Sequence, residues 1–309
     1  MIDLRSDWVA PPTDAMWEAM RAAEWRALPL LEARVSDLLG KDAAVWTPTC
    51  SVANLAALLT LCEPGDRVAL EDDAHILTTE GMGIEHVAHL QPVALEDARR
   101  ATLVCLENTH TRRGGTILNA DETTRLGALA PRSHLDGARL PNAAAALGVP
   151  MAELAAPVET VALSLNKGLG APAGAVLAGN ASAIEEARVH LRRVGAASVH
   201  QAHRLAAAGL VALDRLREVG DDNLRARYLA ERLAALDGVE VDRPETNIVF
   251  FSVAGRDARQ VLADLERNGV LGYLVDERRV RLVTHREIGD GEVAQAAAAV
   301  ATVAGTGPG

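Results

Sequence analysis

Short apolar runs recur along the chain up to residue 179, and helical patterns separate most of them. The runs are AAVWTP (43–48), RVALED (67–72), TLVCLENTH (102–110), SHLDGARL (133–140), VALSLNK (161–167) and GAVLAG (174–179). After the first run, SVANLAALLTLC (51–62) has the apolar spacing of a helix that begins at a turn of small residues. Strands that alternate with helices in this way predict an α/β fold with a mainly parallel sheet.

The N-terminal segment differs from this pattern. The first dozen residues predict an extended arm that ends in a Pro-Pro pair. We expect the helix that follows to start at a cap by Thr13, to be interrupted near Pro29 and to stop at Gly40. The arm is therefore predicted to lead into the first helical layer of the fold.

The C-terminal third has a different order of elements. From about residue 202 the chain changes to long helices rich in Ala, Leu and Arg. Further on we expect a strand over 247–253, a helix over 257–269, a strand over 279–285 and an alanine-rich helix over 291–303. This order indicates a smaller α+β domain.

The length of 309 residues favours two domains or one large α/β domain. The change of pattern predicts an N-terminal arm over 1–12, a large domain over 13–207 and a small C-terminal α+β domain over 208–309. We find no internal repeat and no low-complexity linker in the sequence.

Charge and composition narrow the classes of partner. The formal net charge of -11 argues against nucleic acid, because no surplus of Lys and Arg is present to neutralise phosphates. The arginine runs at 98–100, 111–113 and 190–193 are typical of solvated faces. No signal segment and no run of about 18 apolar residues is present, so we expect no membrane partner. Three cysteines without metal-like spacing predict a reduced, cytoplasmic setting and no metal site.

Polar residues gather at the predicted carboxyl ends of the strands. In open parallel sheets, ligands bind beyond these ends. The residues found there are Thr49, Cys50 and Ser51, Asp73 and His75, Glu107 to His110, Asp136 with Arg139, and Lys167. An acid, a base, a cation and a lysine are therefore expected at one edge of the sheet.

Lys167 stands in SLNKGLGAPAG (164–174), just after an apolar run and just before several glycines. A lysine desolvated at a strand end is a nucleophile toward carbonyl groups, and a neighbouring carboxylate such as Asp136 suits a protonated pyridine nitrogen. Pyridoxal phosphate needs both groups, and its phosphate needs N–H groups like those of the turn at Thr49, Cys50 and Ser51. A single lysine at a strand end is usually solvated, and a single Asp-Gly pair usually forms a turn. The occurrence of both together with the turn at Thr49, Cys50 and Ser51 favours a pyridoxal-phosphate site.

Several segments resemble the threonine aldolases, a β-eliminating-lyase-like group of fold-type I pyridoxal-phosphate enzymes. They are LRSDWV, TPTCSVANLAALL, LVCLENTH, HLDGARLPNAAAALGV, SLNKGLGAPAGAVLAG, TNIVFF and RLVTH, in this order from residue 2 to about 286. The resemblance implies a mainly parallel seven-stranded sheet between helices, with pyridoxal 5'-phosphate in the large domain. It also implies a homodimer or homotetramer whose site lies at the subunit interface.

The resemblance assigns roles residue by residue. It implies that Lys167 forms the covalent link to the cofactor, that Asp136 pairs with the pyridinium nitrogen, and that His75 stacks on the ring. The other expected roles are Arg139 near the ring 3-oxygen or the substrate carboxylate, His110 near the substrate hydroxyl, Ser6 and Arg281 on the substrate carboxylate, and Ser51 on the phosphate. His75, His110 or a water relayed by either is the candidate base, and the sequence leaves these alternatives open.

The implied reaction is cleavage or formation of the Cα–Cβ bond of a β-hydroxy-α-amino acid such as threonine or allo-threonine, with glycine and an aldehyde as products. Another reaction of the same cofactor (β-elimination, racemisation or decarboxylation) and a non-catalytic binding protein are the alternatives. The chain departs from the family pattern at Trp8 in the expected substrate site, at Cys50 in the phosphate turn, and at His200, which replaces an arginine that helps to bind the cofactor. A loop expected between residues 24 and 31 is absent.

Overall fold

The computed structural model describes residues 1–81 and 83–305, and the chain divides into two compact units. The large unit comprises Pro12–His110 and Leu118–Leu216. The small unit comprises Met1–Pro11, Thr111–Ile117 and Arg217–Gly309. The domain boundaries expected from the sequence, after residues 12 and 207, stay a prediction.

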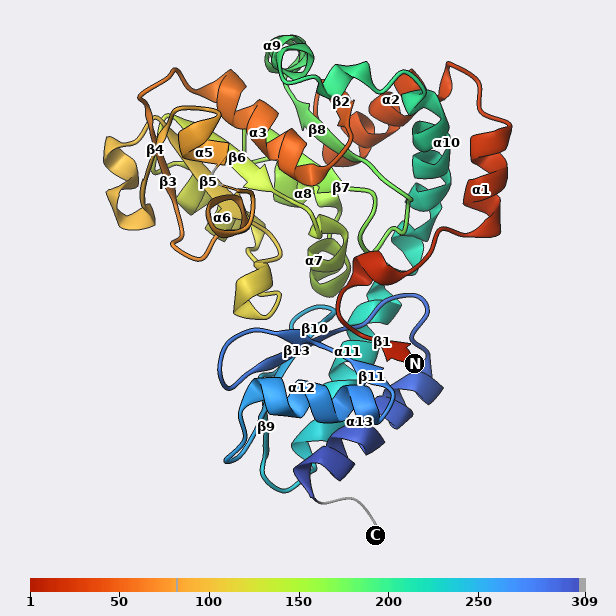
Figure 1. The fold of residues 1–309 in the computed structure, drawn as a ribbon. Helices are drawn as coiled ribbons and strands as arrows, with labels where there is room; N and C mark the ends of the chain where they lie inside the picture. Colours follow the sequence, from red (N-terminus) through yellow and green to blue (C-terminus); the bar gives the residue numbers. More distant parts are fainter. Residues whose placement is uncertain (82, 306–309) are drawn as a thin grey trace. The chain divides into compact units, whose positions relative to one another are not determined.

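The large unit is built on a seven-stranded sheet with the order β2-β8-β7-β6-β5-β3-β4 (Figure 1). Its strands are β2 (Ala43–Thr47), β3 (Arg67–Leu70), β4 (Gln91–Ala94), β5 (Leu103–Glu107), β6 (Arg132–Asp136), β7 (Thr160–Ser164) and β8 (Ala175–Gly179). In this order, the strands β7, β6, β5, β3 and β4 are parallel to one another. Strand β8 is antiparallel to both of its neighbours, β7 and β2. The predicted mainly parallel seven-stranded sheet is confirmed, and β4 is a strand that the hydrophobic pattern did not predict.

Helices cover both faces of this sheet. They are α1 (Asp14–Arg21), α2 (Ala27–Leu39), α3 (Cys50–Leu61), α4 (His75–Thr78), α5 (Gly83–His86), α6 (Ala120–Gly127), α7 (Leu140–Leu147), α8 (Met151–Ala155), α9 (Ala181–Arg193) and α10 (Ala202–Ala212), with 3-10 turns at Leu95–Arg100 and Ala196–Ser198. In Figure 1, α3 and α9 lie on one face, and α6 and α7 lie on the other. Both faces of the central strands β5, β7 and β8 are therefore buried, which explains their nearly continuous apolar runs.

The expected interruption of the first helix near Pro29 was wrong. The chain leaves the helical conformation after Arg21 and re-enters it at Ala27, so the break separates α1 from α2. Pro29 is the third residue of α2, where helix geometry leaves the backbone N–H without an intrahelical partner and its loss costs nothing. The cap by Thr13 is confirmed, since its side chain accepts the N–H of Met16 at 3.2 Å, and Gly40 ends α2 with φ 61°.

The small unit combines a four-stranded antiparallel sheet, in the order β12-β13-β10-β9, with a two-stranded parallel sheet of β1 and β11. Its elements are β1 (Ile2–Asp3), a 3-10 turn (Asp7–Val9), a 3-10 turn (Thr111–Arg113), α11 (Val219–Ala234), β9 (Val239–Val241), β10 (Ile248–Val253), α12 (Ala258–Arg267), β11 (Val270–Leu271), β12 (Tyr273–Leu274), β13 (Val280–Val283) and α13 (Asp290–Ala304). The strands and helices expected from 247 to 303 are present, and β1, β9, β11 and β12 are additional.

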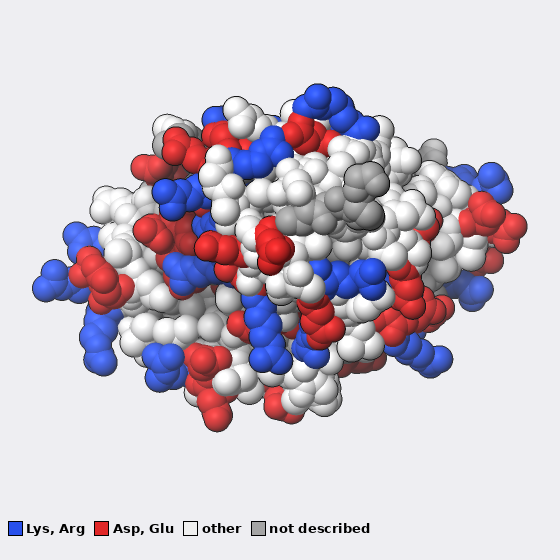
Figure 2. Space-filling view, turned by 90° about the horizontal axis from the view of Figure 1, so that it is seen from below, with Lys and Arg blue, Asp and Glu red and all other residues white. Residues whose placement is uncertain are grey.

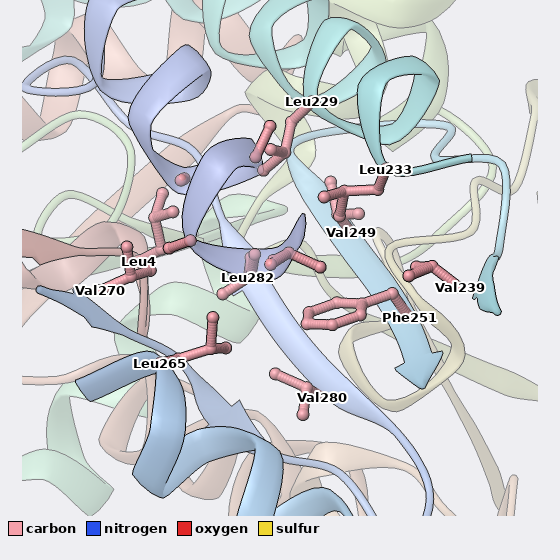
Figure 3. Close-up of a cluster of buried hydrophobic side chains, with 14 of the residues drawn as sticks. Leu4, Leu229, Leu233, Val239, Val249, Phe251, Leu265, Val270, Val280 and Leu282 are labelled. Carbon is pink, nitrogen blue, oxygen red and sulfur yellow. The ribbon is translucent and has the colours of Figure 1, made fainter. Parts of the chain in front are cut away.

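The N-terminal arm belongs to the core of the small unit. Leu4 is fully buried, and Figure 3 shows it in one apolar cluster with residues of the strands and helices, among them Leu229, Phe251 and Leu282. Backbone hydrogen bonds hold it there, because Leu4 donates to the carbonyl of Leu271 at 2.9 Å and accepts from Val283 at 2.8 Å. Burial of one leucine side chain contributes about 1.5–3 kcal/mol, so the arm residues next to Leu4 are held firmly in place.

The surface carries mixed charge. Figure 2 shows Lys and Arg side chains interspersed with Asp and Glu over the described residues of the face seen from below. None of the helices in residues 1–81 and 83–305 is long and apolar enough to cross a membrane. The expected lack of a nucleic-acid partner stays a prediction.

Candidate active site

The carboxyl ends of six strands, β2 to β7, lie at one edge of the large sheet. Glu107 at the end of β5 pairs with Asp136 at the end of β6, and Asp136 pairs with Ala162 of β7. Because β8 is antiparallel to both of its neighbours, β2 runs in the same direction as β7 and its end, Thr47, also reaches this edge. The sheet therefore brings together the ends of segments that lie up to 120 residues apart in sequence, as the pattern predicted.

Lys167 lies half-buried in the tight loop that joins β7 to β8. The loop is closed by hydrogen bonds from Leu165 N–H to the carbonyl of Gly174 at 3.0 Å and from Gly170 N–H to the carbonyl of Lys167 at 2.8 Å. Gly174 has φ 112°, and a Cβ atom there would come within 2.5 Å of Trp46 Nε1. Glycine is thus required at 174, and the loop presents the lysine at a fixed position.

A buried arginine also holds this loop. Arg215 is 9% exposed, and its Nε donates to the carbonyl of Gly168 at 2.7 Å. The hydrogen bond anchors the residue directly after Lys167, so Arg215 supports the lysine although the sequence pattern did not single it out.

Asp136 is 2% exposed and receives hydrogen bonds on both carboxylate oxygens. Ala138 N–H donates to Oδ1 at 3.1 Å, and Asn54 Nδ2 donates to Oδ2 at 3.0 Å. The next residue must be glycine, because a Cβ at Gly137 would lie 2.9 Å from the carbonyl oxygen of Ala162. These contacts suit an ionised carboxylate with a fixed orientation.

The turn at Thr49, Cys50 and Ser51 opens α3. Thr49 is the N-cap and accepts the N–H of Val52 at 3.2 Å. The N–H groups of Cys50 and Ser51 belong to the first turn, which helix geometry leaves without carbonyl partners and which therefore favours a phosphate. The three residues have the local structure expected of an anion site, at the same edge as Asp136.

Cys50 links this turn to Asp136 and Lys167. Its Sγ lies 3.9 Å from Asp136 Oδ1. Burial, followed by the charge of Asp136, raises the pKa of the Cys50 thiol well above its usual value of 9.0, while the charge of Lys167 opposes the rise. The thiol is therefore neutral at physiological pH and is no nucleophile in this environment.

His75 is held by two carboxylates. Its backbone N–H donates to Glu107 Oε2 at 2.8 Å, and its ring Nδ1 lies 3.0 Å from Glu80 Oε1. The side chain is 26% exposed, so one edge of the ring remains open to solvent or a ligand. The expected ring-stacking histidine is thus rigidly oriented at the sheet edge.

His110 is nearly fully buried and faces three acidic side chains. Its Nε2 lies 3.1 Å from Glu71 Oε2, 3.4 Å from Asp73 Oδ1 and 3.8 Å from Glu107 Oε2. Burial lowers the pKa of His110, but the hydrogen bond with Glu71 and the negative charges of Glu107, Glu71 and Asp73 outweigh it and raise the pKa above 6.5. This imidazole therefore stays protonated to a higher pH than an unperturbed histidine.

We expect the protonated His110 to stabilise the fold in a pH-dependent way. Because its pKa is raised in the folded state, its contribution is fully present below about pH 6.5 and is lost as the pH rises through the folded-state value. His110→Gln should lower the free energy of unfolding by about 1–3 kcal/mol in weakly acidic solution and by less at alkaline pH. Urea unfolding of both proteins over a series of pH values measures this difference.

His190 provides a control of opposite sign. Burial, followed by the charge of Arg193, lowers its pKa, so protonation of His190 opposes folding as the pH falls. His190→Gln should therefore gain stability relative to the wild type in acid. If the free energy of unfolding that His110→Gln loses were the same at every pH, the raised pKa assigned to His110 would be contradicted.

Two sets of side chains bring three potential metal ligands within 4.8 Å of one another. They are Glu71, Asp73 and His110, and His75, Glu80 and Asp136. Hydrogen bonds and ion pairs within each set account for the close approach. The expectation of no metal stays a prediction.

Two further residues expected around the cofactor, Arg139 and His200, differ in burial. Arg139 is 4% exposed and precedes α7. His200 is exposed in the turn before α10, and its role in cofactor binding stays a prediction.

Of the residues expected to bind substrate, Ser6, Trp8 and Arg281 belong to the small unit, whereas Arg139 belongs to the large unit. Ser6 is buried, and its Oγ donates to Asp7 Oδ1 at 3.2 Å. Arg281 on β13 donates from Nη2 to the carbonyl of Arg5 at 3.2 Å, which brings its guanidinium to the arm next to Ser6. Trp8 is 58% exposed. Arg281 thus reaches the arm beside Ser6, and the roles of Ser6, Trp8 and Arg281 in substrate binding stay predictions.

The sequence pattern missed Asn54, Glu80, His134 and Arg215. Asn54 carried a usable signal, because it is a single amide inside the apolar helix α3, four residues after Cys50 and hence on the same face. The sequence gives no comparable signal for Glu80 and Arg215, since charged residues in such segments are usually solvated.

A model described as beta-eliminating lyase matches residues 3–101 and 96–256. The chain belongs to the beta-eliminating lyase family. This lyase is 35% identical over 334 aligned positions to low-specificity L-threonine aldolase 1 of Arabidopsis thaliana, with 94% of this chain and 93% of the relative covered. The chain is 33% identical to the low specificity L-threonine aldolase of Escherichia coli K12, with 96% of this chain and 98% of the relative covered. The resemblance to threonine aldolases is confirmed.

Solved structures show the same fold. A putative L-allo-threonine aldolase from Listeria monocytogenes matches this chain with a TM-score of 0.83 at 20% identity, over 98% of this chain and 96% of its own. A Leishmania major threonine aldolase matches with a TM-score of 0.80 at 19% identity, over 98% and 100% of the two chains. A serine palmitoyltransferase from Sphingomonas wittichii has a TM-score of 0.76 at 17% identity, over 99% and 88%. The predicted fold-type I architecture is confirmed.

Proposed function

We propose that this protein is a pyridoxal-phosphate-dependent aldolase that cleaves or forms the Cα–Cβ bond of β-hydroxy-α-amino acids such as threonine, with glycine and an aldehyde as products. The observation that carries the proposal is the likeness to relatives named low-specificity L-threonine aldolases, at 33–35% identity over more than nine tenths of both chains. The side chains at the sheet edge supply the chemistry that such a reaction needs.

The residues at this edge fit the cofactor. When bound, pyridoxal phosphate supplies an aldehyde that joins covalently to amines and a pyridinium ring that accepts the electrons of a broken bond at Cα. Lys167 is the amine, and the doubly hydrogen-bonded Asp136 is the counter-charge for the ring nitrogen. The first turn of α3 at Thr49, Cys50 and Ser51 holds the phosphate, and Arg139 and His200 are assigned to the cofactor on the resemblance.

The substrate is held by its carboxylate. We assign this role to Arg281 with Ser6 or Arg139, because guanidinium groups bind carboxylates through paired, charge-assisted hydrogen bonds. A fixed carboxylate determines which bond at Cα can break, and alignment of Cα–Cβ selects the aldol reaction. Trp8 is assigned to the substrate side-chain pocket.

A histidine takes the proton from the substrate hydroxyl. His75 suits this role because Glu80 fixes its Nδ1, which leaves Nε2 as the basic nitrogen. The acidic side chains around His110 raise its pKa, which shifts this histidine toward the protonated form and suits it to donate a hydrogen bond. We therefore favour His75 as the base, acting directly or through water.

We further propose a cytoplasmic homodimer or homotetramer with the site at the subunit interface. Cys50, Cys62 and Cys105 are free thiols, which suits a reducing compartment. Trp17, Trp25 and Leu30 are 41%, 73% and 51% exposed, which suits a surface covered by a second copy.

The test is a substrate screen with the purified holoenzyme. Threonine, allo-threonine and phenylserine are supplied in turn, and aldehyde and glycine are measured together. Equal amounts of both products are expected from at least one substrate. A keto acid with ammonia would show β-elimination instead, and absence of visible cofactor absorbance would exclude the proposed chemistry.

A further inference from the structure

A buried amide joins the two parts of the candidate active site. Asn54 on α3 is completely buried, and its Nδ2 donates to Asp136 Oδ2 at 3.0 Å and to Glu80 Oε1 at 2.9 Å. Glu80 Oε1 also lies 3.0 Å from Nδ1 of His75. One side chain therefore connects the carboxylate assigned to the ring nitrogen with the carboxylate that orients the ring-stacking histidine.

The orientation of the Asn54 amide follows from its partners. A reversed amide would place its oxygen against two carboxylate oxygens, which repel it, so the NH₂ group must face Asp136 and Glu80. Each of its two N–H bonds then serves one carboxylate. The amide oxygen faces His134 Nε2 at 3.1 Å, and this nitrogen must donate.

His134 completes the chain of donors. Complete burial lowers its pKa to about 4, although the charge of Asp136 opposes the shift, so the ring is neutral near pH 7. With a proton on Nε2, Nδ1 is an acceptor, and the hydroxyl of Thr160 donates to it at 2.9 Å. Every hydrogen bond in the chain from Thr160 through His134 and Asn54 thus points toward the two carboxylates.

We propose that Asn54 is a positioning residue for the cofactor chemistry, which fixes the orientation of the Asp136 carboxylate and couples it through Glu80 to the orientation of His75. The inference rests on the proposed function, because it presupposes that Asp136 faces the pyridine nitrogen. Hydrogen bonds from Asn54 Nδ2 and Ala138 N–H hold both carboxylate oxygens, so the negative charge of Asp136 keeps one orientation toward its expected partner. Through Glu80, the same amide fixes His75 with Nε2 as the basic atom.

The test compares Asn54→Leu with the wild type. Leucine has a similar volume and no donor, so it removes both hydrogen bonds from the carboxylates. We expect the Kd for pyridoxal phosphate, titrated into the apoprotein, to rise about 10- to 100-fold, the effect of losing a hydrogen bond to a charged group. We also expect kcat to fall at least about tenfold with little change in KM, since the substrate carboxylate has other partners. The pH midpoint of the cofactor absorbance should shift.

Thr60→Val is the matched control. Thr60 lies on the same helix, is buried, and donates only to the carbonyl of Ala56 at 2.7 Å. It should leave the Kd, kcat and pH midpoint close to those of the wild type. Equal losses in Thr60→Val and Asn54→Leu would mean that Asn54 acts only by packing α3, and would overturn the inference.

Glu80→Gln keeps the inference falsifiable if Asn54→Leu does not fold, as judged by thermal unfolding of the apoprotein. It keeps the length of the side chain but removes the charge that holds His75. We expect kcat to fall about tenfold, and the double variant to lose less than the sum of the two single losses, as coupled residues do. Unchanged kcat and pH midpoint in Glu80→Gln would overturn the coupling.

The outcomes separate this inference from the proposed function. An Asn54→Leu protein with wild-type Kd and kcat refutes the role of Asn54 while the function stands. A wild-type protein that binds no pyridoxal phosphate refutes the function itself.

Discussion

Replacement of Lys167 by alanine is expected to abolish covalent attachment of pyridoxal phosphate and to reduce turnover by roughly four orders of magnitude or more, the scale on which loss of a covalent catalytic group is felt. The side chain lies half-buried in the β7–β8 loop, within electrostatic reach of the Cys50 thiol that contacts Asp136. No other amine at this edge of the large unit, among the described residues, can take its place. The measurement is the visible absorbance of the lysine-linked cofactor together with aldehyde release.

The chain offers a clean control, because Lys41 and Lys167 are its only two lysines. Lys41 donates to the carbonyl of Val158 at 2.6 Å, and burial lowers its pKa, so it is the one competing lysine amine. Borohydride reduction and peptide mass spectrometry should place the cofactor on Lys167 in the wild type and in Lys41→Arg. Attachment to Lys41, or an absorbance band that survives in Lys167→Ala, would refute the assignment.

After Lys167→Ala, the substitution Asp136→Asn is expected to reduce kcat most. It keeps the shape of the side chain but removes the negative charge opposite the ring nitrogen. Breaking a buried pair of charges costs roughly 3–5 kcal/mol, which corresponds to a fall in kcat of about 10²- to 10⁴-fold. KM should change little, because the substrate carboxylate is assigned to other residues. Steady-state kinetics at saturating cofactor give both numbers.

Asp136→Glu is the companion variant. It retains the charge but moves it by one methylene, away from Ala138 N–H and Asn54 Nδ2. Its kcat should lie between the values of the wild type and Asp136→Asn. An Asp136→Asn protein that keeps kcat within threefold of the wild type would show that this carboxylate does not hold the ring nitrogen.

Much of the large unit could be predicted because its information is local. Apolar runs gave the strands of the sheet except β4 (Gln91–Ala94), a short strand whose residues are all exposed or half-buried. A cap gave the helix start at Thr13, and a turn of small residues gave the start of α3. Strand ends then indicated Asp136, His75 and Lys167, since a parallel sheet places all carboxyl ends of its parallel strands on one edge.

The environment of His110 could not be predicted in this way. Glu71 and Asp73 follow β3, whereas Glu107 ends β5, and only the pairing of β3 with β5 brings these carboxylates around one imidazole. Sequence separation alone does not say which strands are neighbours. The raised pKa of His110 is therefore a consequence of strand order.

By itself, the sequence determined the α/β fold, the family and the inventory of reactive side chains, because periodicity, caps and short motifs act over a few residues. The tertiary structure decided how those side chains are joined. Asn54, Glu80 and His134 come from α3, from the segment after α4 and from β6, and only their packing makes a continuous chain of hydrogen bonds that ends on Asp136. Hydrogen bonds act over about 3 Å, so residues that are far apart in sequence can contribute only after folding has buried them together.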